Sequence, residues 1–125
     1  MIENEISGTI VDCCYKIHSA LGPGLLESVY EEVLVHELSK RNLNIRRQEG
    51  IPVKYDTIKL DLGFRADIIV EDKVIIEIKS VESLARVHYK QLQTYLKLTG
   101  LKLGLLVNFN EALIKDGIKR VVNNL

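Results

Sequence analysis

The sequence contains no tryptophan and only two cysteines, two prolines and one methionine among its 125 residues. Cys13 and Cys14 are adjacent, which makes them poor partners for a mutual disulfide and too few for a zinc site. No apolar run approaches the roughly 20 residues of a membrane span, and the acidic N-terminus lacks the segments of a secretory signal. We therefore expect a cytoplasmic protein with no membrane partner.

An excess of charge of one sign is also missing, because 17 basic residues balance 17 acidic ones. Proteins that bind nucleic acid often carry a basic excess, so any attraction to a polyanion has to be local here. A carboxylate site that binds a divalent cation would add positive charge that this count leaves out. With 46% hydrophobic residues, the chain has enough apolar material for one core, and we expect residues 1–125 to form a single domain.

Hydrophobic periodicity predicts two helices followed by a group of strands. Apolar residues recur at helical spacing up to Leu21, where Gly22-Pro23-Gly24 interrupts the pattern. The same spacing restarts at Leu26 and continues to Leu38, before Arg41-Asn42. Residues 45–78 are instead rich in Val, Ile and Tyr and contain several turn residues, which predicts an antiparallel meander of three strands.

The remaining chain predicts one more helix and further strands. We predict Ser83 as the N-cap of a helix that runs to about Leu98 and ends at Thr99-Gly100. Residues 102–107 read as a strand, and Asp116-Gly117 signals a tight reversal, so the chain would finish with a short hairpin or edge strand. This order of elements predicts an α/β fold in which a mixed sheet is flanked by helices.

Besides Arg65, three charged residues interrupt the two most hydrophobic strands of the meander, residues 65–70 and 74–79. Because isolating a carboxylate from water is costly, Asp67, Glu77 and Lys79 must be paired, bound to a metal, or placed at a strand end that opens into a cleft. Side chains alternate along a strand, so Glu77 and Lys79 share one face. A three-residue loop at 71–73 would put Asp67 opposite Glu77, whereas a two-residue loop would send the two acids to different faces.

Two carboxylates that converge in this way repel each other unless a cation lies between them, and oxygen ligands favour a hard ion such as Mg²⁺ or Mn²⁺. Such an ion would polarise a phosphoryl oxygen and lower the pKa of a bound water, while Lys79 would orient that water or offset charge on the phosphate. This chemistry is that of phosphodiester hydrolysis. The alternative is a salt-bridged hairpin in which Lys79 neutralises both acids.

Two further charged residues are candidates for the same site. Glu27 lies early in the second predicted helix, where it would complete the coordination of the metal directly or through water; the alternative is a favourable interaction with the helix dipole. Arg65 shares a strand face with Asp67 and would either contact phosphate or form a salt bridge with Asp67.

Polar residues also interrupt the apolar stripe that we predict for the third helix, which consists of Leu84, Val87, Leu92 and Leu98. His88, Gln91 and Tyr95 need hydrogen-bond partners there, either within the core or in a cleft that holds substrate. We favour the cleft for Gln91 and Tyr95 and a structural role for His88.

These residues together resemble a known signature. Asp67 followed by Glu77-x-Lys79 resembles the PD-(D/E)XK nuclease motif, with Glu27 in the position of its upstream helical glutamate, and Gln91-x-x-x-Tyr95 resembles the QxxxY motif of the RecB-type branch. More closely, Gly24-x-x-Glu27-x-x-Tyr30 resembles the motif that names the GxxExxY proteins. The likeness covers nearly the whole chain and includes Gln48, Pro52-Val53, Phe64-Arg65-Ala66-Asp67, residues 94–100, residues 104–109 and residues 116–120.

The resemblance implies a restriction-endonuclease-like αβββαβ core, preceded here by an extra N-terminal helix, and catalysis with Mg²⁺ or Mn²⁺. The functional residues that it implies are Asp67, Glu77 and Lys79 for catalysis, Glu27, Asp67, Glu77 and Ile78 for metal binding, and Gln91 and Tyr95 for substrate binding. Candidates for supporting roles are Tyr30, Gln48, Arg65 and His88.

The function that we expect is metal-dependent hydrolysis of DNA, with RNA as the second choice. The alternative is a catalytically silent module on a nuclease scaffold, which binds nucleic acid or protein and acts only with a partner. A minimal core without a basic excess offers little surface for gripping a duplex, so a homodimer or a partner protein is also expected.

Overall fold

The structure, a computed structural model, describes residues 1–125 except for the side chain of Leu62. Two helices, α1 (Glu3–Leu21) and α2 (Glu27–Lys40), precede an antiparallel meander of β1 (Ile45–Tyr55), β2 (Ile58–Val70) and β3 (Val74–Lys79). Helix α3 (Arg86–Thr99) then leads to β4 (Leu103–Asn108), and the one-turn helix α4 (Ile114–Gly117) precedes β5 (Ile118–Val122). The order of elements predicted from the sequence is confirmed.

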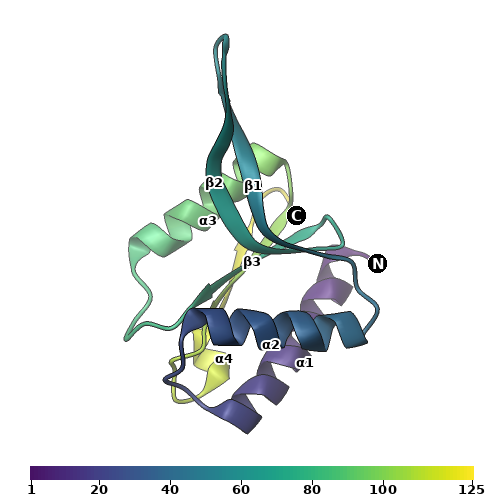
Figure 1. The fold of residues 1–125 in the computed structure, drawn as a ribbon, viewed down its shortest axis with the longest axis vertical. Helices are drawn as coiled ribbons and strands as arrows, with labels where there is room; N and C mark the ends of the chain where they lie inside the picture. The colour runs from purple at the N-terminus through teal and green to yellow at the C-terminus, as the bar shows by residue number, and fades with distance from the viewer.

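The five strands form one mixed sheet in the order β1-β2-β3-β4-β5. Strands β3 and β4 are parallel and are connected through α3, whereas the other neighbouring strands are antiparallel. Figure 1 shows α3 on one side of the sheet and α1, α2 and α4 on the other. Helix α2, the meander, α3 and β4 make up an αβββαβ core with α1 as an extra N-terminal helix, which is the restriction-endonuclease-like fold that the sequence predicts.

Apolar side chains are buried on both faces of the sheet. One cluster joins α1 and α2 to alternate residues of the central strands, among them Ile68, Ile76 and Val107. The other cluster joins α3 to the intervening residues, among them Ile69, Ile75 and Leu106. Burial on both faces explains why the central strands are almost continuously hydrophobic. Within the described chain, no helix combines the length and hydrophobicity that crossing a membrane requires.

Helix α3 begins later than predicted, and only part of its predicted apolar stripe is buried. Its N-cap is Ala85 rather than Ser83, because the amide and carbonyl groups of Val81 are hydrogen bonded to the Asn108 side chain at 3.1 and 3.0 Å, which ties the preceding segment to the end of β4. Val87 of the predicted apolar stripe is 63% exposed and Leu98 is 42% exposed. The buried residues of the helix are Leu92, which the prediction includes, together with Tyr95 and Leu96.

Asp116-Gly117 does not form the predicted tight turn, but the predicted edge strand follows it. Residues 114–117 form the short helix α4, and β5 then pairs antiparallel with β4. An added Cβ atom at Gly117 would lie 2.2 Å from the carbonyl oxygen of Asn108. Glycine is therefore required here because two backbone segments approach closely. In the sequence, the same glycine after an aspartate looks like a turn.

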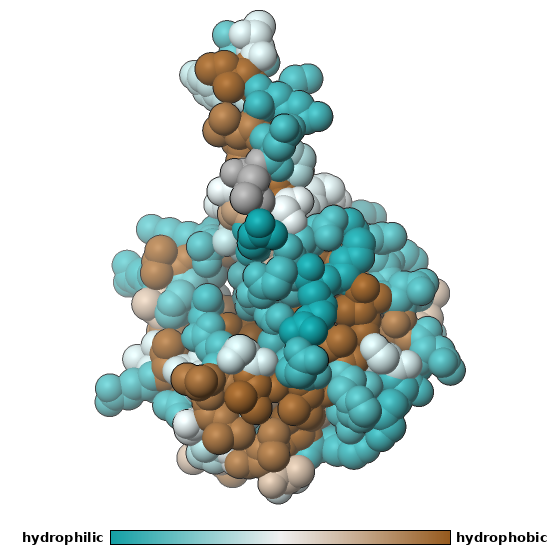
Figure 2. All heavy atoms as spheres, in the orientation of Figure 1, coloured by the Kyte–Doolittle hydropathy of each residue, from teal (hydrophilic) through white to brown (hydrophobic). Residues whose placement is uncertain are grey.

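The β1–β2 hairpin extends beyond the body of the molecule (Figure 1). Tyr55 pairs with Ile58 across the two-residue turn Asp56-Thr57, and Asp56 has a φ of 54°. Tyr55 is 76% exposed and Ile58 is 57% exposed, and Figure 2 shows hydrophobic surface on this projection. The hairpin is thus an arm with no element of the described chain packed over its tip.

Candidate active site

Asp67 and Glu77 occupy opposite positions on β2 and β3. The register pairs Val70 with Val74 and Ile68 with Ile76, as the three-residue loop predicts, so the next opposed positions are 67 and 77. At these positions the backbone amides donate hydrogen bonds to carboxylate side chains instead of to backbone carbonyl groups. The Asp67 amide donates to Glu77 Oε2 at 2.7 Å, and the Ile78 amide donates to Asp67 Oδ2 at 2.8 Å. The two carboxylates therefore lie together where the β2–β3 ladder ends.

Burial and mutual repulsion make both acids hard to ionise. Burial, followed by the charge of Asp67, raises the pKa of Glu77 to about 8, against the opposing effect of the Asp67 amide. Burial also raises the pKa of Asp67, although the hydrogen bond from Ile78 acts in the other direction. Glu77 is only 4% exposed, whereas Asp67 is half-buried. A positive charge between the two carboxylates would relieve this repulsion.

Lys79 follows Glu77 on the same strand face, at the end of β3. Its ammonium charge lowers the pKa of both Asp67 and Glu77, although other effects on those groups are larger. Among the residues that the structure describes, Lys79 forms no ion pair with either acid. The alternative of a hairpin closed by salt bridges from Lys79 therefore lacks its defining contact.

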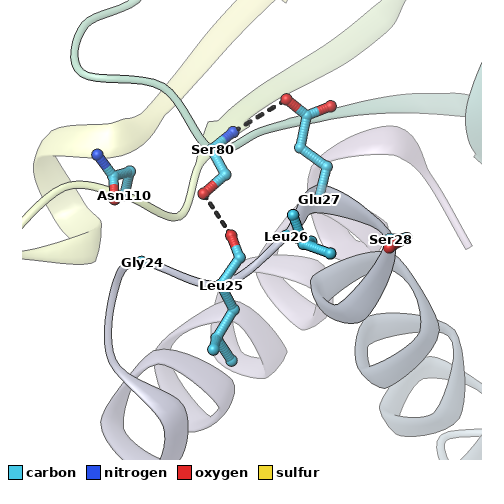
Figure 3. Close-up of a pocket in the computed structure, with 7 residues that line it drawn as sticks. All are labelled: Gly24, Leu25, Leu26, Glu27, Ser28, Ser80 and Asn110. Carbon is cyan, nitrogen blue, oxygen red and sulfur yellow. Dashed lines mark hydrogen bonds between the residues drawn. The ribbon is translucent and has the colours of Figure 1, made fainter.

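Glu27 is the first residue of α2, and its side chain reaches the backbone of Ser80 (Figure 3). Its Oε2 atom accepts a hydrogen bond from the Ser80 amide at 3.3 Å, so it is tied to the residue after Lys79. Ser80 Oγ in turn donates to the Leu25 carbonyl at 2.7 Å. These contacts form one wall of a cavity of about 500 Å³ that is lined by Gly24, Leu25, Leu26, Glu27, Ser28, Ser80 and Asn110.

Tyr30 shapes the loop before Glu27. Its hydroxyl donates to the Gly22 carbonyl at 2.6 Å and accepts from the Leu25 amide at 3.1 Å, while its buried ring stacks on Phe109 at 4.4 Å. Gly24 has a φ of 98°, a conformation that is open to glycine and strained for other residues. Gly24, Glu27 and Tyr30 therefore fix the approach of α2 to the end of β3.

Glu31, which was not predicted as a site residue, acts on the paired acids through its charge. Its charge contributes to raising the pKa values of Asp67 and Glu77. It is 7% exposed and accepts hydrogen bonds from Arg47 Nη2 at 2.9 Å and from Gln48 Nε2 at 2.8 Å. Gln48 Nε2 also donates to Asp67 Oδ1 at 3.4 Å. Glu31 lies one helical turn after Glu27, and that spacing is the signal that could have identified it.

Arg65 acts through its guanidinium on the backbone of β1, whereas Ile78 acts through its own backbone. Arg65 Nη1 donates to the Gln48 carbonyl at 3.0 Å, so the predicted salt bridge from Arg65 to Asp67 is replaced by a contact with β1. The Ile78 side chain is buried in the α1–α2 cluster and its amide is bonded to Asp67. Its carbonyl oxygen is thus the one atom of Ile78 that could bind a metal.

The three candidate residues of α3 lie in different environments: Tyr95 is buried, Gln91 is exposed, and His88 is hydrogen bonded at the start of the helix. Tyr95 is 5% exposed and stacks on Phe64 at 3.7 Å, and burial followed by the charges of Glu77 and Asp67 raises its pKa to about 12. Gln91 is exposed on the same helix. His88 accepts a hydrogen bond from the Ala85 amide through Nδ1 at 3.0 Å, which is the structural role that we favour for it.

The donor set suits a hard divalent ion that is held partly by substrate. No group of three His, Cys, Asp or Glu side chains able to hold a metal occurs within the described residues. Mg²⁺ commonly binds to one or two carboxylates, keeps several waters and takes further ligands from substrate phosphates. The buried Asp67–Glu77 pair, whose mutual repulsion a cation would relieve, fits that mode of binding.

Comparison with known protein families identifies the superfamily of the chain. A family model described as the PD-(D/E)XK nuclease superfamily matches residues 4–121 of the chain. No curated protein sequence gives a significant match.

Proposed function

Since the chain belongs to the PD-(D/E)XK nuclease superfamily, we propose that it is a Mg²⁺- or Mn²⁺-dependent nuclease whose preferred substrate is DNA. The proposal treats residues 1–125 as one catalytic domain and the chain as a member of the GxxExxY group within the superfamily. The observation that carries it is the pair of carboxylates, Asp67 and Glu77, cross-bonded at the end of the β2–β3 ladder with Lys79 beside them.

Each residue in this region has a role that follows from its position. Asp67 and Glu77 would hold the metal, together with the carbonyl oxygen of Ile78. Glu27 would take part through a water molecule, because its carboxylate accepts a hydrogen bond from the Ser80 amide. The ion would polarise the scissile phosphate and lower the pKa of the attacking water. Lys79 would orient that water and offset the charge that develops on the phosphate.

Substrate binding involves the α3 side of the site. The Tyr95 ring is fixed by stacking on Phe64, and its hydroxyl belongs to the region of the two acids, as their effect on its pKa indicates. Gln91 is exposed one turn earlier on α3, where its amide is free to meet a strand that enters the site. These two residues position the nucleic acid for cleavage.

The test is cleavage of plasmid DNA, single-stranded DNA and RNA with Mn²⁺ by the wild-type protein and by the Asp67→Ala and Lys79→Ala variants. Glu82→Ala and Lys102→Ala are matched controls, because both residues are exposed and neither is assigned a role in the site. We expect DNA cleavage by the wild type and by both controls, and a loss of about 100-fold or more in the two site variants. An inert wild type, or an active Asp67→Ala protein, would contradict the proposal.

A second candidate function is that of a binding module that needs a partner. Two observations favour it: the chain has no net charge, and both acids already accept hydrogen bonds from backbone amides. In that case the wild type would bind nucleic acid or a partner protein and cleave nothing alone. Sedimentation analysis with and without DNA separates a monomer from a homodimer, and cleavage regained after adding a partner would identify this function.

A further inference from the structure

We propose that Gln48 is a positioning residue, whose carboxamide is held by Glu31 and fixes the orientation of the Asp67 carboxylate. The proposal deepens the proposed nuclease function because it concerns the same site. The orientation of Asp67 by Gln48 is a property of the metal-free protein, so it can be tested without measuring cleavage.

Gln48, Asp67 and Glu77 form a row across the sheet. Arg47 pairs with Ile68 and Glu49 pairs with Ala66, so Gln48 lies opposite Asp67 on β1, as Glu77 does on β3. Neither the 48–67 position nor the 67–77 position is among the regular pairs of its ladder. Asp67 is therefore outside the regular backbone pairing with both β1 and β3. The position of its carboxylate depends on hydrogen bonds that involve side chains.

Gln48 adopts an unusual backbone conformation at this point. Its φ is 48°, in the left-handed region that favours glycine, although it lies in the middle of a strand. The Arg65 guanidinium donates to the Gln48 carbonyl at 3.0 Å and so holds this conformation. Strained residues of this kind persist only where their surroundings fix them, and they are frequent at functional sites.

The conformation of Gln48 places its side chain between two carboxylates. Nε2 donates to Glu31 Oε1 at 2.8 Å and, over a longer distance of 3.4 Å, to Asp67 Oδ1. Glu31 is itself fixed by Arg47, which donates to it at 2.9 and 3.3 Å. The shorter bond anchors the carboxamide on α2, and the longer one restrains the oxygen of Asp67 that does not accept from Ile78.

This arrangement orients both oxygens of Asp67. Oδ2 accepts from the Ile78 amide and Oδ1 accepts from Gln48, so rotation of the carboxylate would break one bond or the other. Residues that hydrogen bond to a metal-binding carboxylate commonly change metal affinity or activity by about 10- to 100-fold when they are replaced. We expect Gln48 to act in this way on Asp67.

The deciding variant is Gln48→Gly, because it removes the carboxamide and relieves the backbone strain at once. Gln48→Gly should melt at the same temperature as the wild type or higher, yet bind Mn²⁺ about 10- to 100-fold more weakly by calorimetry. In the metal-free protein, the Ile78 amide resonance should shift and exchange faster with solvent. Glu31→Ala should move the same two readouts in the same direction, because it removes the anchor of the carboxamide.

Asn42→Gly is the matched control, since Asn42 also has a left-handed φ, of 62°, and lies outside the site. It should leave Mn²⁺ affinity and the Ile78 amide unchanged. A Gln48→Gly protein that binds Mn²⁺ within twofold of wild type and keeps the Ile78 amide unmoved would overturn the proposal. If the wild type binds no Mn²⁺, the proposed nuclease function fails, and the Ile78 amide alone decides the role of Gln48.

Discussion

The Asp67 amide donates a hydrogen bond to the Glu77 carboxylate across the gap where the regular pairing of β2 and β3 ends. A carboxylate in this position satisfies a buried amide, but it is also surrounded by apolar residues and another acid. Burial and the charge of Asp67 therefore make the metal-free protein less stable when Glu77 is ionised, although the hydrogen bond from the Asp67 amide acts in the other direction.

Replacing Glu77 by Gln should stabilise the metal-free protein, increasingly so as the pH rises. Burial raises the pKa of Glu77 from an ordinary value of 4.5 to about 8, so its contribution to stability is full below pH 4.5 and is lost as the pH rises through 8. The neutral amide avoids this loss and can still accept from Asp67. With about 1.4 kcal/mol for each pKa unit, we expect a gain of at least about 1 kcal/mol at pH 8. Thermal melting in EDTA between pH 5 and pH 8 measures it.

The exposed Glu82 provides the control for this measurement, since Glu82→Gln should give no pH-dependent difference. Equal melting temperatures of wild type and Glu77→Gln at pH 5 and at pH 8 would show that Glu77 is not buried as an unfavourable charge.

The Tyr30→Phe variant should lose about 1 kcal/mol of unfolding free energy and loosen the loop before α2. The phenol hydroxyl bonds to both Gly22 and Leu25, whereas the ring that stacks on Phe109 stays in place in the variant. Urea denaturation measures the first effect, and faster hydrogen exchange at the Leu25 amide measures the second. Tyr55→Phe, at the exposed tip of the hairpin, should change neither.

Two glycine substitutions should have opposite effects on stability. An added Cβ at Gly8 of α1 meets nothing within 4 Å, so Gly8→Ala should stabilise the protein by about 0.5–1 kcal/mol through helix propensity. At Gly117 the added Cβ would lie 2.2 Å from the Asn108 carbonyl, and Gly117→Ala should cost about 1–3 kcal/mol. Chemical denaturation of the two variants beside the wild type is sufficient. A stabilised Gly117→Ala protein would contradict the close packing of α4 on β4.

The His88→Ala variant should be less stable by about 1 kcal/mol and cleave nucleic acid as the wild type does. His88 accepts from the Ala85 amide and thereby caps α3, a role that does not involve substrate. The melting temperature and the initial cleavage rate are measured together, with the exposed His36→Ala as control. A large loss of cleavage at an unchanged melting temperature would assign His88 to the substrate instead.

The central part of the fold could be predicted because its determinants are local. The loop at residues 71–73 fixes which side chains of β2 and β3 are opposed, and the pairing of Val70 with Val74 follows from the loop length alone. Alternation then places Asp67, Glu77 and Lys79 without any reference to the rest of the molecule. The strands could be predicted to be buried because Val and Ile fill most of the positions around these charged residues.

What could not be predicted depends on contacts between distant segments. Ser83 has the chemistry of an N-cap, but Asn108 holds Val81 from another strand and α3 starts later. Asp116-Gly117 is a pair typical of turns, but glycine is needed at position 117 because the Asn108 backbone approaches it closely. Gln48 gives no sign in the sequence that its backbone is left-handed, because the contact from Arg65 that holds it comes from the neighbouring strand.

The strand that carries Glu77 and Lys79 is also the one least able to detach. Strand β3 lies in the middle of the sheet, paired with β2 on one side and β4 on the other, and five of its six residues are buried. Local fraying releases edges and termini first, at little free-energy cost, whereas interior strands open only when the whole domain does. The acids of the site should therefore keep their arrangement until global unfolding, and amide exchange along β3 should report the full stability of the protein.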